Sequence, residues 1–328
     1  MRTVVAAAML AGAAMAQAAS DPAEALAAYH ADTAAALAAS PAVRDRVLAL
    51  RFEALGRMQE GEEAADAERL AALVADAGAD PRALAWLAAE PLLAPSQREA
   101  VLARLLAVAP DDLNAHLLAI AMAAAGGEPA RVTAAVEAAA ARETLDAGSA
   151  ELLSMYVELL ARHPLPAVVV AAMDEAAGGA VASEAYAFAL WSRDVPPYRP
   201  LLRVCEPTAV ADDPARDAAC QRLGRRLFEQ GDLILAQTVG YAVLYKLVDP
   251  AEAAPLAEGM RRIEWQQESV GRLIAEPGRE QAHLREWLAA MRRPGSTESA
   301  NAAAFLARAG RPLDPPDDWR SVRERGME

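Results

Sequence analysis

Apolar residues recur at helical spacing in five short segments of the chain. These segments begin at Arg82 (RALAWLAAE), Ala115 (AHLLAIAMAAAG), Ala150 (AELLSMYVELLA), Ser183 (SEAYAFALWSRD) and Arg216 (RDAACQRLGRRL). Each one starts 33 to 35 residues after the one before it. A nearly constant step of this size is typical of a repeat built from one small structural unit.

A second helical stretch follows each of these segments. The second stretches cover residues 97–109, 129–141, 165–177, 198–205 and 232–248. Each unit is therefore predicted to be a helix hairpin, and stacked neighbours bury the apolar stripe that a single hairpin leaves open.

Helix-start signals accompany this pattern. Asp-Pro pairs begin at residues 21, 80, 213 and 249; Asp suits the N-cap, and Pro suits the first helical position. Ser96 and Glu99 have the spacing of a capping box.

The sequence predicts an all-α fold that forms a single elongated body. Residues 19–79 are an N-terminal helical segment, 80–250 the hairpin array, and 251–311 a set of C-terminal helices. The Pro-rich and charged residues 312–328 are expected to be extended or disordered. Trp319 either anchors this tail on the body or is an exposed aromatic residue.

The predicted core relies on a few large side chains, because alanine buries little area while letting helix axes approach closely. These large residues are Leu117, Leu118, Leu152, Leu153, Met155, Tyr156, Phe188, Leu190, Trp191, Leu223 and Leu227.

The unit length and the hairpin pattern resemble a tetratricopeptide array from about Arg82 to Val248. The stretch LLAVAPDD, from Leu105, looks like the proline-containing end of such a repeat, and Ala119, Ser154 and Gly224 match its small residue at the helix crossing. The resemblance implies a right-handed superhelical array of antiparallel hairpins. It also implies a concave surface that binds a peptide or protein segment.

The first residues have the pattern of a secretory signal peptide. Arg2 precedes an apolar stretch that ends in Ala16-Gln17-Ala18, an A-x-A cleavage pattern; an alanine-rich first helix is the alternative. We therefore expect residues 1–18 to be removed and the mature chain to be periplasmic or secreted. The style of the signal and the composition indicate a Gram-negative bacterium.

Acidic residues outnumber basic ones, with a net charge of −14 that becomes −15 when cleavage removes Arg2. Such a chain is poorly suited to nucleic acid or to anionic lipid, because both require clustered Lys and Arg. An acidic concave face would favour a basic partner. No stretch after the signal is apolar for long enough to insert in a membrane.

Cys205 and Cys220 are the only cysteines. In an oxidising compartment an even cysteine count predicts a disulfide, and the two would pin the end of one helix to the next. Free buried thiols and a metal site are the alternatives, although a metal would need further ligands and the four histidines are scattered.

Motifs for known cofactor and metal chemistry are absent from the sequence, so no cofactor and no metal site is predicted. Glu280-x-x-His283 is half of a di-iron helix motif. Gln267-Glu268-Ser269 resembles the catalytic context of lytic transglycosylases, in which burial raises the pKa of the acid. The resemblance covers only these three residues, and an exposed pair of Glu268 with Arg272 is the competing interpretation.

Three functions stay open at this point. The first is a non-enzymatic, exported helical-repeat protein that binds a protein or peptide in the cell envelope. The second is an enzyme, for instance one directed at peptidoglycan, with a site among Glu268, Glu280, His283 and Glu286. The third is a purely structural envelope protein.

Overall fold

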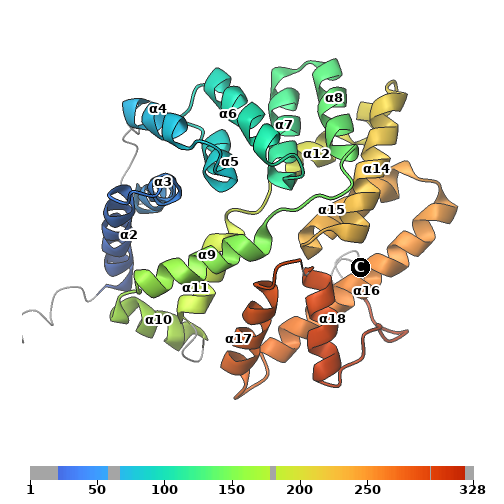
Figure 1. Ribbon diagram of the computed structural model, residues 1–328. Helices are drawn as coiled ribbons and strands as arrows, with labels where there is room; N and C mark the ends of the chain where they lie inside the picture. The colour runs from blue at the N-terminus through green and yellow to red at the C-terminus, as the bar shows by residue number, and fades with distance from the viewer. Residues whose placement is uncertain (1–20, 58–66, 178–181, 296, 322–328) are drawn as a thin grey trace, which may run out of the picture.

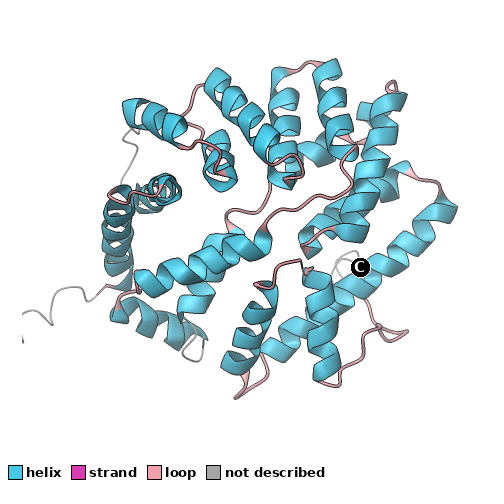
Figure 2. Ribbon diagram, viewed as in Figure 1, coloured by secondary structure: helices cyan, strands magenta, loops and turns pink. Residues whose placement is uncertain are grey.

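The computed structural model describes residues 21–57, 67–177, 182–295 and 297–321, and this part of the chain consists of helices joined by loops. These ranges contain seventeen helices and no strand beyond one isolated bridge (Figure 2). The all-α prediction is confirmed. The predicted signal peptide, residues 1–18, lies outside the described residues.

The helices are labelled in Figure 1. In chain order they are α2 (Pro22–Ala38), α3 (Val43–Arg57), α4 (Ala67–Asp76), α5 (Pro81–Ala89), α6 (Pro95–Val108), α7 (Leu113–Gly126), α8 (Pro129–Ala140), α9 (Ser149–Arg162), α10 (Ala167–Ala177), α11 (Ala182–Ser192), α12 (Tyr198–Val204), α13 (Pro207–Val210), α14 (Pro214–Gln230), α15 (Ile234–Leu247), α16 (Pro250–Ile274), α17 (Glu280–Met291) and α18 (Glu298–Arg308).

Aspartate caps begin several of these helices. The carboxylates of Asp21, Asp80, Asp213 and Asp249 each accept a hydrogen bond from a backbone N–H of the first turn, at 2.8 to 3.0 Å. The capping box predicted at Ser96 is wrong by two residues: α6 follows Ala94, whose N–H donates to the Gln97 side chain at 3.0 Å.

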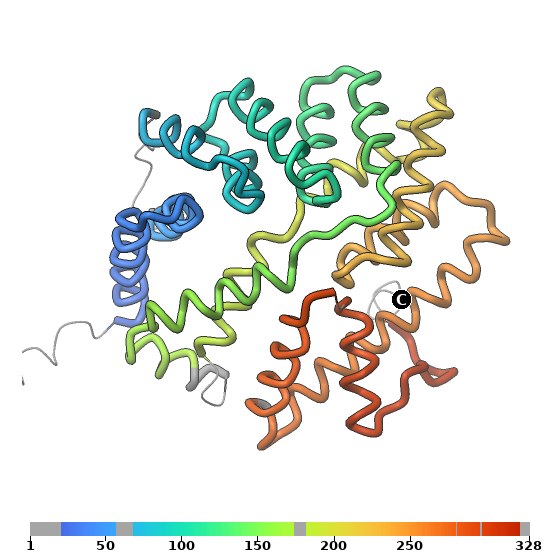
Figure 3. Tube along the Cα trace, in the orientation of Figure 1, coloured from blue at the N-terminus to red at the C-terminus, as the bar shows by residue number. Residues whose placement is uncertain are grey.

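The hairpins do not all stack in the order of the sequence. Helix α5 packs on α6, α7 on α8, and α14 on α15. Besides its hairpin partner α7, helix α8 contacts α14. Helix α7 contacts α12, and α12 in turn contacts α15 (Figure 3). The prediction that each hairpin stacks on the next is therefore wrong after α8, because residues 141–177 and 182–197 leave the row.

These residues carry α9, α10 and α11, which form a separate group. Helix α9 pairs with α11, and α10 lies against α2. The Tyr29 hydroxyl of α2 donates to the carbonyl of His163, just after α9, at 2.9 Å. In Figure 1 most other helices follow an arc from α2 to α17, and α9 lies inside it.

The C-terminal helices reach the same group from the other side. Arg285 of α17 pairs with Glu184 of α11 at 3.5 Å, and Arg292 donates to the Ser154 hydroxyl of α9 at 3.3 Å. Both ends of the helical chain thus contact α9–α11. The expected single elongated body is wrong, since the chain closes back on its own middle segment.

Leucine is the commonest residue in the described core, and alanine is the next. Most of the large residues named above are buried, but Phe188 is 36% exposed and is not a core residue. Gly224 of α14 faces Gly240 of α15, and a Cβ on either glycine would press on the other helix. Two glycines at one crossing let these helix axes approach closely.

The predicted disulfide between Cys205 and Cys220 is present, with Cα atoms 5.7 Å apart. It ties the residue that ends α12 to the middle of α14, across the short helix α13. Both cysteines are buried. The bridge therefore fixes the place where the row of hairpins resumes after α9–α11.

Residues 312–321 follow α18 without forming a helix and lie along α16. Trp265 and Gln266 donate to the carbonyls of Pro312 and Leu313 at 3.2 and 3.1 Å. The Trp319 ring meets the edge of Trp265 with centroids 5.6 Å apart, and Arg261 lies over it. The structure therefore agrees with the first alternative for Trp319, in which this residue anchors the tail on the body.

Candidate binding pocket

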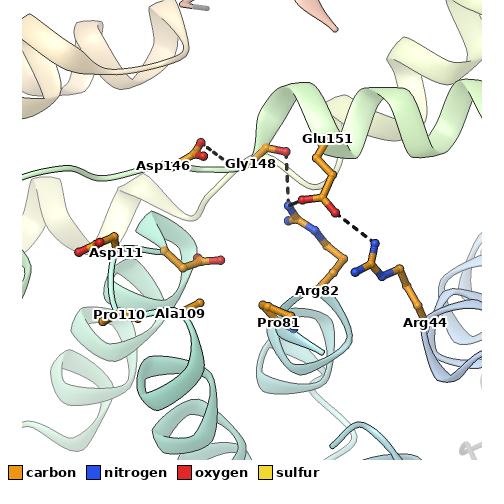
Figure 4. Close-up of a pocket in the computed structure, with 10 residues that line it drawn as sticks. Arg44, Pro81, Arg82, Ala109, Pro110, Asp111, Asp146, Gly148 and Glu151 are labelled. Carbon is orange, nitrogen blue, oxygen red and sulfur yellow. Dashed lines mark hydrogen bonds and ion pairs between the residues drawn. The ribbon is translucent and has the colours of Figure 1, made fainter. Parts of the chain in front are cut away.

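A pocket of about 270 Å³ lies where the first turns of α5, α7 and α9 meet (Figure 4). Arg44 of α3 closes one side. The lining residues are Arg44, Pro81, Arg82, Ala109, Pro110, Asp111, Asp112, Asp146, Gly148 and Glu151.

Backbone hydrogen bonds fix the segment that leads into α9. The N–H of Leu113 donates to the carbonyl of Asp146 at 3.0 Å, and the N–H of Asp146 donates to that of Asp111 at 3.1 Å. Gly148 has a φ of 64°, and its N–H donates to the Asp146 carboxylate at 2.8 Å. The start of α9 is thereby tied to the start of α7.

The two arginines of the pocket are held by partners. Arg82 is buried and donates to the carbonyl of Gly148 at 3.3 Å, with a Glu151 oxygen 3.9 Å away. Arg44 pairs with both Asp80 and Glu151 at 3.1 Å. Figure 4 shows Glu151 between the two guanidinium groups. Their charge is therefore largely compensated within the protein.

The remaining carboxylates give the pocket an excess of negative charge. Neither Asp111 nor Asp146, both exposed, forms an ion pair with another described residue. Burial raises the pKa of Asp112, and the charge of Asp146 adds to this effect, while the N–H of Ala115 and the charge of Arg82 oppose it. Chemically, the arrangement suits a cationic group that enters from solvent.

In the described part of the chain, no cluster of three or more His, Cys, Asp or Glu side chains has an arrangement that could hold a metal ion. Nor does any described helix combine the length and the apolar character that a membrane span requires.

Three of the four enzyme candidates from the sequence have described side chains, and each of the three has a local partner. Glu268 pairs with Arg272, as its i, i+4 spacing allows. His283 contacts the carbonyl of Leu273 through Nδ1 at 2.6 Å, and its ring meets the edge of Phe305. Glu286 pairs with Arg308 at 2.7 Å. The side chain of Glu280 lies outside what the structure describes.

Sequence reasoning did not find the pocket, although parts of it carried signals. The cap at Asp80 was identified, but Asp112, which is followed by Leu113 rather than proline, was not. The glycine of DAGSAE, with its left-handed backbone, marks the sharp entry into α9. The burial of Arg82 has no local signal, because it depends on Gly148, which is distant in sequence.

Comparison of the chain with protein-family models, with curated proteins and with solved structures finds no match to any of them.

Proposed function

We propose that the mature chain is an exported, non-enzymatic protein that binds a segment of another protein in the cell envelope, in the periplasm or outside the cell. The observation that carries this proposal is the pocket at the starts of α5, α7 and α9. Within this pocket the charges of Arg44 and Arg82 are compensated, whereas Asp111 and Asp146 form no ion pair with another described residue. The pocket therefore suits a lysine or arginine side chain of the bound protein.

The packing of the helices supports the proposal, although the hairpin array differs from the one that the sequence predicted. The contacts of α5 with α7, α7 with α12, and α12 with α15 form one row, and those of α8 with α14 form another. Two such rows are compatible with a tetratricopeptide-like superhelix that α9–α11 interrupts. In this arrangement the chain's own α9–α11 covers part of the inner face, and the partner binds at the margin where α9 begins.

Affinity capture from periplasmic extract with the mature chain tests this function. We expect a saturable protein partner whose capture weakens with added salt and is lost in the double variant D111N/D146N. The asparagine that D146N introduces keeps a side-chain oxygen that can accept from the N–H of Gly148, so the entry to α9 is preserved.

A matched control is D317N/D318N, which removes the same two charges from the exposed tail. Capture that both double variants weaken equally would show a dependence on net charge alone and reject the pocket. Absence of any saturable partner would instead favour a structural role, and turnover of a small molecule in the extract would favour an enzyme.

A further inference from the structure

The turn between α14 and α15 places Asp232 where four helices begin. The N–H of Glu298, the first residue of α18, donates to the carbonyl of Asp232 at 2.7 Å. In return a Glu298 carboxylate oxygen accepts from the N–H of Ile234, the first residue of α15, at 2.8 Å. Ser149 at the start of α9 and Tyr198 at the start of α12 also face Asp232.

The carboxylate of Asp232 is enclosed, and the donors that act on it are the hydroxyl and N–H of Ser149 and its own backbone N–H. Both of its oxygens are closed to solvent, and neither accepts a hydrogen bond of normal geometry from a described residue. The hydroxyl of Tyr198, a residue only 5% exposed, is equally closed and equally unbonded. A buried carboxylate is unfavourable in its charged form unless it is paired or hydrogen-bonded.

The charged groups that act on Asp232 make ionisation still harder. They are Asp146, from the segment before α9, and Glu298 of α18, and both are acids. Burial raises the pKa of Asp232, and the charge of Asp146 raises it further, although the hydroxyl and N–H of Ser149 act in the opposite direction. Burial and the charge of Asp232 likewise raise the pKa of Glu298, against the N–H of Ile234.

We propose that Asp232 is a proton-binding latch, whose neutral carboxyl group joins the start of α9 to the starts of α12, α15 and α18. The protonated acid is neutral, so it relieves the repulsion from Asp146 and Glu298. It also gains an O–H donor, which the hydroxyl of Ser149 can accept.

The direction of the pH effect follows from the folded state holding this proton more tightly than the unfolded chain. Ionisation of Asp232 therefore lowers the stability of the fold. The loss begins as the pH rises above the aspartate pKa of the unfolded chain, and it is complete above the folded pKa. Acidification reverses it and tightens the junction between α9–α11 and the rest of the protein.

The substitution D232N tests the latch, because Asn copies the shape of the protonated acid and cannot ionise. In chemical denaturation of the mature chain at about pH 7.5, well above the ordinary aspartate pKa, we expect D232N to raise the unfolding midpoint above wild type. The gain should shrink as the pH falls and vanish near about pH 4. The control D318N removes one exposed charge and should show no such trend. A midpoint below wild type at every pH would overturn the proposal.

Infrared spectroscopy gives a second measurement, in which D232N assigns the signal, because burial also raises the pKa of Asp112 and of Glu298. A protonated carboxyl has a C=O band separate from that of carboxylate, and exposed aspartates are ionised by about pH 6. We expect the folded wild type to keep a protonated band to higher pH than the unfolded chain, and D232N to lack the part of this band that Asp232 contributes. A folded wild type whose protonated band matches that of folded D232N at every pH would equally overturn the latch.

Discussion

Arg82 of α5 donates a hydrogen bond to the carbonyl of Gly148 at 3.3 Å, and this contact seats the start of α9 against the helical row. A Cβ on Gly148 would collide with the guanidinium group of Arg82. The glycine is therefore needed for two reasons, since its left-handed backbone also disfavours any residue with a side chain.

The substitution G148A is expected to destabilise the protein by more than the backbone strain alone. Strain in the left-handed region accounts for about 1–2 kcal/mol, and the displaced Arg82 adds to it. The control is G127A, since Gly127 has a φ of 71° and open space around its Cβ position. Urea denaturation should show a larger loss for G148A; equal losses would mean that the Arg82 contact is dispensable.

The crossing of α14 and α15 should be intolerant of even one methyl group. A Cβ on Gly240 would meet the backbone of Phe228 and of Gly224. We expect G240A to destabilise the fold by roughly 1–3 kcal/mol or more through overpacking. By contrast, G271A in α16 meets nothing within 4 Å and should stabilise by about 0.5–1 kcal/mol. Thermal unfolding of both variants measures this contrast, and a stable G240A would argue against close approach at Gly240.

The disulfide is expected to contribute about 3 kcal/mol, because the cysteines are 15 residues apart and the bond restricts the unfolded chain. Denaturation with and without reductant measures this difference. The double variant C205S/C220S should match the reduced wild type and show no response to reductant. A wild-type midpoint unaffected by full reduction would mean that the packing of α12 and α14 suffices alone.

The tail should depend on the Trp319 ring rather than on its indole N–H. The ring contacts Trp265 and Arg261, whereas its Nε1 has no hydrogen-bond acceptor among the described residues. We expect W319A to expose Arg320, the single trypsin site of residues 312–321, to limited proteolysis, and W319F to protect this site nearly as well as wild type. Equal digestion of all three proteins would show that the carbonyl contacts with α16 hold the tail without this ring.

The sequence by itself determined the features that depend on neighbours along the chain. Helical periodicity and capping act within one or two turns, so the helices could be predicted, as could the start of α5 at Asp80. The disulfide could also be predicted, because it spans one short connection. The acid excess was equally visible. The pocket was not, because Arg82, Asp112 and Gly148 meet only after folding.

Only the tertiary structure decided which hairpin lies beside which. The repeated segments have similar alanine and leucine faces, so the spacing at Ala150 and Ser183 could not show that α9 pairs with α11 and that α8 skips to α14. The burial of Asp232 was decided in the same way, by four helix starts from distant parts of the chain. Local sequence specifies where an apolar stripe lies on a helix, whereas the partner that covers it is chosen by the free energy of the whole packed chain.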